Sequence, residues 1–354
     1  MNITIIGAGN GGQAMASHFT LLGHKVCLFN RQLDSIIDIK LNKKIIIKGK
    51  IDGVSYIDKV TDNYQEALKD AEIVMIVTVA NAHKQIAFEI APFVTDGQIF
   101  ILNPGRSFGA IQFRKTFESV SSKHIYIAET QSLIYACRII SNGVVNVIGV
   151  KNKVPLSALP FSDTDYVIDK INTVFNCFIK ADNVLHTSLN NIGAILHPAI
   201  VLFNVANIER KNKFYFYKDI TPEISNFIIK LDKERLSIGK SYGLDLLSIS
   251  DWISFSYKGV AGNNLLNKIK NNPAYSEIYG PTHLSSRLLT EDIPTGIIPM
   301  ISLAKKANIN TPLLISILNM SKALLGTDFD KDERSLKNLD LDNLTKDEFI
   351  KILL

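Results

Sequence analysis

The sequence predicts an α/β protein, with an N-terminal Rossmann domain built on a doubly wound parallel sheet and an all-helical C-terminal domain. A chain of 354 residues is too long for a single compact core. Its first half alternates short apolar runs with helical patterns, which is typical of a parallel sheet with helices on both faces. After about residue 180 long helical patterns dominate. We therefore expect two domains, residues 1–180 and 181–354.

The first domain is expected to contain five parallel strands separated by helices. The strands are expected at Ile3–Ile6, Lys25–Phe29, Ile73–Val77, Gln98–Leu102 and His124–Ile127, and the helices at Gly12–Leu22, Tyr64–Lys69, His83–Pro92 and Ser107–Ser119. The segment Lys44–Ile57 is instead typical of a small hairpin, with Asp52 and Gly53 as its turn.

The second domain is expected to be helical throughout. The helical patterns cover Thr187–Arg210, Pro222–Tyr242, Leu246–Phe255, Gly296–Ala307 and Pro312–Leu325. Thr221 is a suitable cap for the helix that begins at Pro222. From Asp328 onward Asp and Lys are dense, which indicates a short solvated extension with one last helix near Thr345–Leu354.

Composition excludes several classes of protein. The chain is 46% hydrophobic and 21% charged, so disordered, collagen-like and coiled-coil proteins are excluded. The net charge of +5 is small for this length and suits an anionic ligand. The sequence has no basic run interleaved with aromatic residues, so nucleic-acid binding is not favoured.

The chain is expected to be cytoplasmic and free of metal. It has three cysteines, Cys27, Cys137 and Cys177, and no CxxC pair, so neither a disulfide framework nor a metal site is expected. No apolar run reaches the ~18 residues of a membrane span. Met1 leads directly into an apolar strand, without a secretory signal.

A glycine-rich turn follows the first expected strand and opens the first helix. Gly7, Gly9 and Gly12 form a GxGxxG pattern in the strand–turn–helix context that dinucleotide binding requires. Gly7 permits the tight turn, Gly9 lets the backbone approach a pyrophosphate, and Gly12 allows the helix to pack on the sheet. Asn10 and Gly11 belong to the same phosphate-binding turn, beside the free N–H groups of the helix N-terminus. The alternative is a glycine-rich turn without a ligand.

The end of the second expected strand favours NADP over NAD as the cofactor. An NAD site usually has Asp or Glu there, which accepts hydrogen bonds from the ribose 2′-hydroxyl. This chain has Asn30, which carries no charge to repel a 2′-phosphate, and then Arg31, which can pair with one. The alternatives are a solvated Arg31 and NAD as cofactor.

Two stretches of the second half contain candidate catalytic residues. His197 lies in an otherwise apolar helical pattern, where the alternative is a hydrogen-bonded core histidine. Arg287, Glu291 and Asp292 stand together just before an apolar helix, where the alternative is a charged helix end. Together they provide a proton donor and acceptor, a carboxylate that orients it, and a guanidinium that grips a substrate carboxylate.

With these motifs the chain resembles the opine dehydrogenase family of the octopine/nopaline dehydrogenase type, from the first strand to about Leu325. The stretches that carry the resemblance are Gly7–Ala16, Asn103–Ser107, Ala128–Gln131 with Tyr135–Arg138, Asn190–Pro198 and Arg287–Gly296. The His-Pro and Arg-x-x-x-Glu-Asp-x-Pro stretches, in this order, are much more specific than the glycine turn.

The resemblance implies an enzyme of amino acid metabolism that condenses an amino acid with a 2-oxo acid and reduces the imine with NAD(P)H, in an active site between the two domains. It implies His197 as general acid and base, Asp292 as its orienting partner and Arg287 as the ligand of a substrate carboxylate. It also implies that the loop of Asn103, Pro104 and Gly105 lies near the nicotinamide ribose, at the carboxyl ends of the strands.

The chain departs from the family pattern at Gly193, at Phe108 and at Asn30, where the acidic residue of an NAD site is absent. Gly193 stands where some relatives have an asparagine one helical turn before the histidine, and Asn190, on the same helical face, is a doubtful substitute for it. Phe108 stands where a small residue is expected. The aromatic residues Trp252, Tyr257, Tyr275 and Tyr279 either line a pocket or belong to the helical core.

Two other functions remain open. One is a ketopantoate-type or glycerol-3-phosphate-type reductase that acts on a single small anionic substrate. The other is a non-catalytic NADP-binding protein, which would have no need of His197, Arg287 and Asp292. The expected partners are small-molecule substrates, with neither nucleic acid nor membrane, and a homodimer is an open alternative to a monomer.

Overall fold

The computed structural model describes residues 1–329 and 333–354. The chain forms two compact units. The first comprises Met1–Gly105, Gly109–Val184 and Leu354, and the second comprises Arg106–Phe108 and Leu185–Leu353. The division at Val184 lies close to the boundary expected from sequence, but the assignment of Arg106–Phe108 to the second unit was not anticipated. Within the described residues, no helix is both long and apolar enough to cross a membrane.

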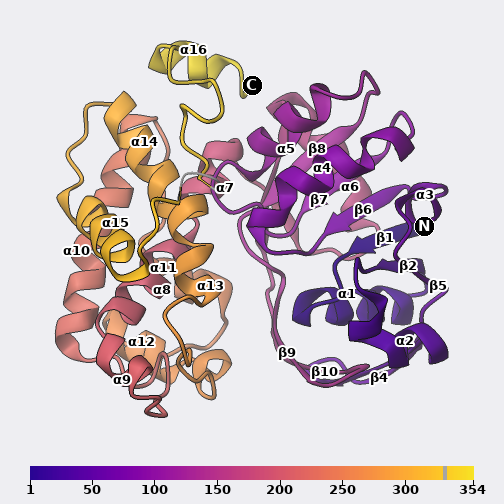
Figure 1. Cartoon of the computed structure of the whole chain (residues 1–354), viewed down its shortest axis with the longest axis horizontal. Coiled ribbons are helices and arrows are strands. Elements are labelled where there is room, and N and C mark those ends of the chain that lie inside the picture. The colour runs from indigo at the N-terminus through magenta and orange to yellow at the C-terminus, as the bar shows by residue number, and fades with distance from the viewer. Residues whose placement is uncertain (330–332) are drawn as a thin grey trace. The chain divides into compact units, whose positions relative to one another are not determined.

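The first unit contains the predicted doubly wound sheet, in the order β12-β11-β8-β7-β6-β1-β2-β5 (Figure 1). The strands are β1 (Asn2–Ile6), β2 (Lys25–Phe29), β5 (Lys59–Thr61), β6 (Ile73–Ile76), β7 (Ile99–Leu102), β8 (Tyr126–Thr130), β11 (Val154–Leu159) and β12 (Phe178–Lys180). All neighbours pair in parallel except β8 and β11. Strands β6 and β7 are buried along their whole length, as expected when helices cover both faces. The predicted fold class is confirmed.

The helices of the first unit follow the expected alternation. They are α1 (Asn10–Leu21), α2 (Ile37–Asn42), α3 (Tyr64–Leu68), α4 (His83–Ile90), α5 (Gly109–Glu118) and α6 (Thr164–Asn172). The strands β5, β11 and β12 and the helices α2 and α6 were not predicted, and β8 begins two residues later than expected.

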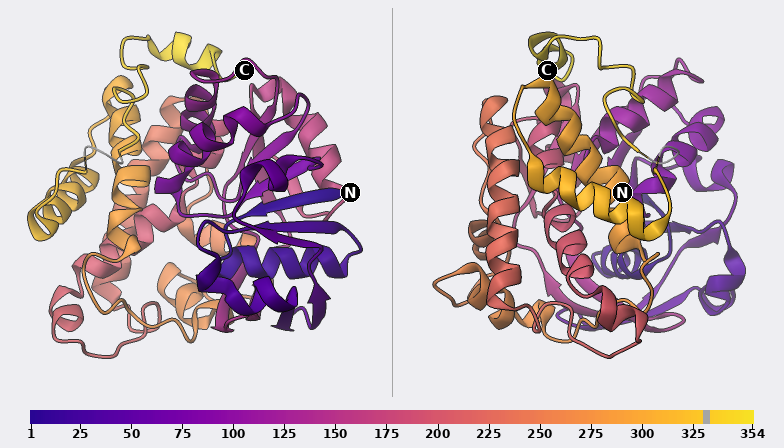
Figure 2. Two further views of the ribbon diagram at one scale, coloured as in Figure 1. Left: turned by 45° about the vertical axis from the view of Figure 1, so that its right-hand side comes forward. Right: turned by 60° about the vertical axis from the view of Figure 1, so that its left-hand side comes forward.

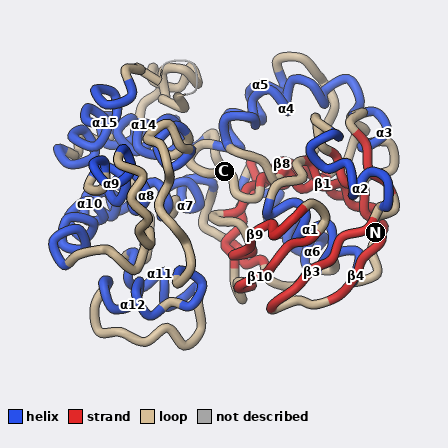
Figure 3. The backbone as a smooth tube through the Cα atoms, turned by 60° about the horizontal axis from the view of Figure 1, so that its bottom comes forward, coloured by secondary structure: helices blue, strands red, loops and turns tan. Residues whose placement is uncertain are grey.

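A second, four-stranded sheet covers α1 on the side away from the main sheet (Figure 3). Its order is β4-β3-β10-β9, with β3 (Lys44–Gly49), β4 (Gly53–Tyr56), β9 (Tyr135–Ser141) and β10 (Val144–Val150). The hairpin at 44–57 is confirmed, but its predicted turn is wrong. Gly53 already pairs with Ile47, so residues 48–52 form the connection. The reason is that β3 continues to Gly49 by pairing with β10 on its other edge.

The second unit consists of helices and connecting loops (Figure 2). The helices are α7 (Val184–Leu189), α8 (Ile192–Leu202), α9 (Val205–Glu209), α10 (Pro222–Ser241), α11 (Ile249–Ser256), α12 (Leu265–Asn271), α13 (Arg287–Thr290), α14 (Ile298–Lys306), α15 (Pro312–Leu325) and α16 (Lys346–Lys351). Helices α8, α10 and α15 pack on one another, and α8 is buried on nearly every side. This packing places the residues of α8 at the centre of the unit.

Two helix predictions for this unit are wrong in their extent. The expected single helix at Thr187–Arg210 is three helices, because the chain breaks before α8 at Asn190-Asn191 and again at Asn204. The helix expected at Gly296–Ala307 begins earlier, as a π-helical turn η6 (Ile293–Ile297) that runs directly into α14.

The described part of the C-terminal tail, residues 327–329 and 333–354, is not a solvated extension. It buries Phe329, Arg334, Leu336, Leu339 and Phe349. Helix α16 begins with a complete capping box, in which Thr345 and Glu348 satisfy each other's backbone N–H groups. The prediction gave weight to the many charged residues of the tail and overlooked the widely spaced apolar residues that anchor it.

Candidate active site

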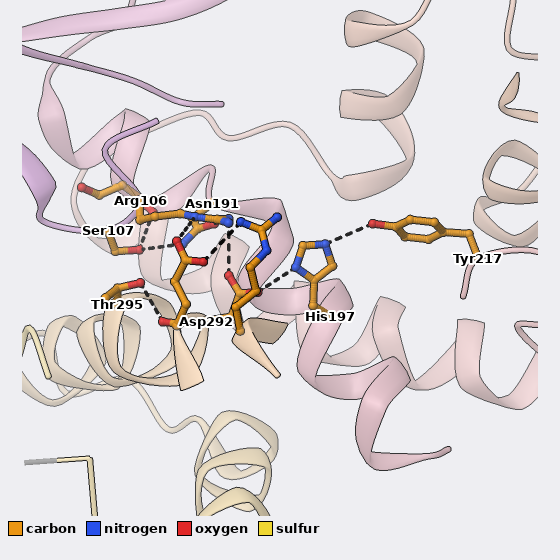
Figure 4. A network of polar contacts seen from close by, with 10 residues as sticks. Arg106, Ser107, Asn191, His197, Tyr217, Asp292 and Thr295 are labelled. Carbon is orange, nitrogen blue, oxygen red and sulfur yellow. Dashed lines mark hydrogen bonds and ion pairs between the residues drawn. The ribbon is translucent and has the colours of Figure 1, made fainter. Parts of the chain in front are cut away.

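A continuous polar network lies inside the second unit (Figure 4). It brings together residues from the 106–108 segment, helix α8, the loop after α9 and the turn that joins α13 to η6. Its members are Arg106, Asn191, His197, Tyr217, Arg287, Glu291 and Asp292.

His197 lies on the one face of α8 that is partly open. Along Ile192–Leu202 only Gly193 and His197, four residues apart, are not fully buried. The next residue, Pro198, has no N–H and so leaves the carbonyl of Ala194 without its helical partner. Because the apolar residues of α8 are packed in the core, the helix fixes the position from which the His197 side chain extends.

Asp292 is the partner of His197. Its Oδ2 lies 2.7 Å from His197 Nδ1, and the carboxylate is 1% exposed. An ionised carboxylate only accepts hydrogen bonds, so Nδ1 carries the proton that is shared with Asp292. The neutral imidazole then presents Nε2 as its acceptor. The contact between His197 and Asp292, 95 positions apart in the sequence, could not be established from the sequence.

Arg106 is the central cation of the network, and sequence reasoning did not include it among the site residues. Its Nη1 lies 3.3 Å from Asp292 Oδ1 and its Nε lies 3.4 Å from Glu291 Oε1. Nη1 also donates to Asn191 Oδ1 at 3.2 Å. Arg106 therefore forms an ion pair with the carboxylate oxygen of Asp292 that His197 does not use.

The charges of this cluster shift the pKa values of its members. Burial raises the pKa of Asp292, but Arg106, His197 and Arg287 outweigh it and hold that pKa below its usual value. Burial also lowers the pKa of Arg106, and the carboxylates of Asp292 and Glu291 raise it above its usual value. Asp292 is consequently an anion and Arg106 a cation throughout the physiological pH range.

Arg287 lies at the open end of the network. It is the first residue of α13, its side chain is 61% exposed, and its Nη1 lies 3.5 Å from Glu291 Oε2. Glu291 thus stands between Arg106 and Arg287. The exposed guanidinium retains donors that a substrate carboxylate can reach.

Tyr217 was also missed by sequence reasoning. Its hydroxyl lies 3.0 Å from His197 Nε2 and donates to that nitrogen, since Nδ1 carries the imidazole proton. The ring of Tyr217 stacks on that of Tyr275. Tyr275 makes an edge contact with Tyr257, which in turn makes an edge contact with Trp252. Tyr279 instead stacks on Tyr215 at the surface. No sequence motif marks Tyr217, because its loop follows a helix end without a recognisable pattern.

The departures from the family pattern have physical explanations here. A Cβ on Gly193 would lie 2.8 Å from Arg106 Nη1 and 3.0 Å from His197 Cε1, so Gly193 leaves space for both side chains. The amide oxygen of Asn190 accepts a hydrogen bond from Arg235, and it is Asn191 that bonds to Arg106. Phe108 is fully buried and packs against Phe349.

The glycine turn of the first unit has the geometry of a phosphate-binding turn. Gly7 has a φ of +104°, and a Cβ on Gly12 would lie 1.7 Å from the Gly7 carbonyl oxygen. A Cβ on Gly9 would meet nothing within 4 Å, so the backbone there is open to a ligand. Helix α1 begins at Asn10 with no side chain capping it, which leaves its first N–H groups for an anion. These residues fit a dinucleotide.

Asn30 ties this turn to the end of β2. Its Oδ1 accepts from the N–H of Ala8 at 3.2 Å, and its Nδ2 donates to the Gln32 carbonyl and to Ser35 Oγ. Arg31 beside it is exposed. Asn103, at the end of β7, is 1% exposed, and neither its amide oxygen nor its amide nitrogen has a partner within the described residues. Buried polar atoms without a hydrogen-bond partner of their own can bond to a polar ligand.

Comparison with known proteins gives matches over both units. Residues 180–325 match the family described as NAD/NADP octopine/nopaline dehydrogenase, alpha-helical domain, and residues 2–106 match the N-terminus of NAD-dependent glycerol-3-phosphate dehydrogenase. A protein named opine dehydrogenase from Arthrobacter sp. (strain 1C) is 35% identical over 343 residues, which are 96% of this chain and 95% of that protein. The chain belongs to the opine dehydrogenase family. Its members are NAD(P)-dependent oxidoreductases that act on CH–NH bonds.

Several solved structures share the fold of this chain. Octopine dehydrogenase with NADH and L-arginine has a TM-score of 0.80 at 19% identity, with 99% of this chain and 97% of that chain covered. Yersinopine dehydrogenase with NADP+ bound has a TM-score of 0.74 at 14% identity, with 100% of this chain and 97% of that chain covered. A ketopantoate reductase from Ralstonia eutropha JMP134 has a TM-score of 0.63 at 13% identity, with coverages of 94% and 99%.

Proposed function

We propose that the protein condenses the amino group of an amino acid with a 2-oxo acid and reduces the resulting imine, with His197 as general acid and base. The observation that carries this proposal is the 2.7 Å contact between His197 and the buried carboxylate of Asp292, which Arg106 holds from its other oxygen. A histidine that is paired in this way can both give and take a proton.

The chemistry divides among the residues of the network. The amine nitrogen attacks the carbonyl carbon, and the proton that the amine loses passes to the carbonyl oxygen. His197, which takes up a proton from solvent at Nε2, gives that proton to the carbinolamine hydroxyl, which leaves as water and leaves a protonated imine to be reduced. Asp292 stabilises the imidazolium through Nδ1, as the carboxylate of a catalytic triad does. Tyr217 gives up its hydrogen bond to Nε2 when the substrate oxygen arrives there. In the reverse direction His197 takes the proton back from the attacking water.

Arg287 is proposed to bind a carboxylate of the substrates. Its guanidinium is largely exposed, and its ion-pair contact with Glu291 is 3.5 Å long. A guanidinium and a carboxylate form two parallel hydrogen bonds, which fix the orientation of the reacting carbon. Both substrates carry such a carboxylate.

NAD(P)H is proposed to bind at Gly7, Gly9, Asn10, Gly11 and Gly12, with Asn103, Pro104 and Gly105 near its nicotinamide ribose. When bound, it supplies the hydride. We propose a preference for NADP, because Asn30 is uncharged and bonded to the protein while the exposed Arg31 is available for a 2′-phosphate.

The test is NADPH oxidation over a matrix of amino acids against pyruvate, 2-oxoglutarate and glyoxylate. We expect oxidation only when an amino acid and a 2-oxo acid are both present. Oxidation with a 2-oxo acid alone would instead indicate a ketopantoate-type reductase. In the same assay His197→Ala should lower kcat by ~10²–10⁴ and leave NADPH affinity nearly unchanged. His283→Ala, at an exposed histidine of the same unit, is the matched control, and a similar loss in both variants would argue against the role of His197.

A further inference from the structure

The C-terminal tail lies outside the residues that match the helical-domain family, which end at residue 325. Two of its large side chains, Arg334 and Phe349, are nevertheless completely buried. A fully buried arginine is rare and requires partners for its donors. The partners of these two side chains lie beside the active site.

Arg334 bonds to two segments of the site at once. Its backbone N–H donates to the carbonyl of Pro294 at 3.0 Å, and its guanidinium Nη1 donates to the carbonyl of Ser107 at 3.1 Å. Ser107 directly follows Arg106, and Pro294 follows Asp292 by two residues. Arg334 thus links the backbone that carries Arg106 to the backbone that carries Asp292.

Phe349, in α16, holds the same segment from another position. Its ring meets the edge of Phe108 at a centroid distance of 6.3 Å, and Tyr242 at 6.5 Å. Phe108 directly follows Ser107, so the tail contacts two consecutive residues after Arg106. Figures 1 and 2 show the tail, in yellow, ending in α16.

The 106–108 segment needs such support because its backbone is strained. Arg106 has a φ of +61° and Phe108 a φ of +60°, and residues other than glycine disfavour this left-handed region. The segment is also bound by the N–H of Ser107 to Thr295 and by the hydroxyl of Ser107 to the Ser188 carbonyl. The tail completes this set of contacts.

We propose that the C-terminal tail is a positioning element of the active site. Arg334 and Phe349 hold residues 106–108 so that Arg106 stays paired with Asp292, which in turn orients His197. The effect on turnover rests on the proposed function above, whereas the anchoring of the segment does not.

The test uses the full-length protein and four variants. Arg334→Met removes the guanidinium, Arg334→Lys keeps a cation, and Phe349→Leu removes the ring with a small change of volume. Lys337→Met removes an exposed cation from the same tail and is the matched control. Each variant is examined at a temperature at which its circular dichroism matches that of the unmodified protein.

The first measurement is amide hydrogen exchange in residues 103–110, which does not depend on activity. Exchange there should be at least tenfold faster in Arg334→Met and Phe349→Leu, intermediate in Arg334→Lys, and unchanged in Lys337→Met. Equal exchange in all variants would overturn the proposal. Phe349→Leu gives this answer even if Arg334→Met fails to fold.

The second measurement separates positioning from mere stability. In the folded variants kcat should fall by about 10- to 100-fold with the KM for NADPH unchanged, because a displacement of ~1 Å at a catalytic group can cost ~10²-fold. Arg334→Lys should recover part of kcat. Faster exchange with an unchanged kcat would overturn the proposal. If the unmodified protein shows no amine-dependent oxidation, the proposed function fails, and the exchange measurement still decides whether the tail anchors the segment.

Discussion

Arg106 has several structural properties that no local sequence pattern predicts. Its guanidinium pairs with Glu291 and Asp292 and its backbone is left-handed, while the sequence around it is typical of a simple loop after a strand. His197 and Asp292, by contrast, could be selected from the sequence because their residue types suit acid–base chemistry. Their roles remain predictions, and their contact is a structural observation.

Arg106→Met should strongly destabilise the protein. It leaves the carboxylates of Glu291 and Asp292 buried without their main cation, and breaking a buried ion pair from one side typically costs about 3–5 kcal/mol. Arg114→Met is the control, since it breaks an exposed i,i+4 pair with Glu118 worth about 0.3–0.5 kcal/mol. Urea unfolding measures both free energies, and equal losses would contradict this account.

The same substitution should change the pH dependence of unfolding. The pKa of Asp292 lies below its usual value in the folded protein, so its contribution to stability is present above the unfolded-state value of about 3.9 and is lost as pH falls through the folded value. Without Arg106 that pKa rises, and the acid transition should move to higher pH. A transition at the same pH in both proteins would remove Arg106 as the cause.

Arg31→Ala tests the cofactor preference. If the exposed guanidinium binds the 2′-phosphate, its removal should raise the KM for NADPH about tenfold or more and leave the KM for NADH unchanged. The increase corresponds to the loss of one charge-assisted hydrogen bond, worth roughly 1.5–3 kcal/mol. Steady-state kinetics with both nucleotides measures this. Arg138→Ala, at another exposed arginine of the first unit, is the control. A parallel change for both nucleotides would argue against NADP as the preferred cofactor.

At the scale of elements, strands and helices with a clear period were predicted within one or two residues. Strand β2 and helix α15 match their expected bounds, because their apolar spacing and flanking residues agree. The errors occur where a partner decides the element. Strand β3 extends past its hairpin because β10 pairs with it. The helix expected at Thr187–Arg210 breaks at Asn190 and Asn191, whose side chains bond to arginines elsewhere in the unit, and again at Asn204, whose Nδ2 donates to the carbonyl of Ile200.

Two glycines of the phosphate-binding turn should respond differently to the same substitution. Gly12→Ala would place a Cβ 1.7 Å from a backbone oxygen, so it should lower the unfolding free energy by at least the ~1–3 kcal/mol of ordinary overpacking. Gly9→Ala meets no atom within 4 Å and should unfold like the unmodified protein, but it should bind NADPH much more weakly. Thermal unfolding and nucleotide titration separate the two, and retained binding in Gly9→Ala would contradict the cofactor site.

At the scale of the molecule, two units share one chain in an interleaved way, since Arg106–Phe108 belong to the second unit while the residues before and after them belong to the first. The expected boundary near residue 180 comes from a change in composition along the chain. Such a change in composition could not predict that residues 106–108, from the first half of the sequence, belong to the second unit and contribute to its polar network.

The stability of the whole protein should fall as the pH is lowered from 6.5 to 4. Burial lowers the pKa of His18 to about 4, below its ordinary 6.5, while Tyr135 bonds to its Nδ1. Between these values the unfolded chain binds a proton that the folded protein does not, so unfolding becomes more favourable as pH falls. His18→Gln should flatten this dependence in thermal scans. His124→Gln, at an exposed histidine, should leave it intact, and equal slopes in all three proteins would contradict the assignment.

The sequence by itself determined the fold class, the glycine-rich turn that is expected to bind phosphate and the identity of the candidate acid–base residues, because these depend on local periodicity, backbone freedom and residue chemistry. Only the tertiary structure decided that Asp292 meets His197, that Arg106 and Tyr217 complete their surroundings, and that Arg334 and Phe349 of the charged tail are buried beside residues 106–108. Contacts between distant residues depend on how whole helices pack, and a single sequence does not state which faces will meet.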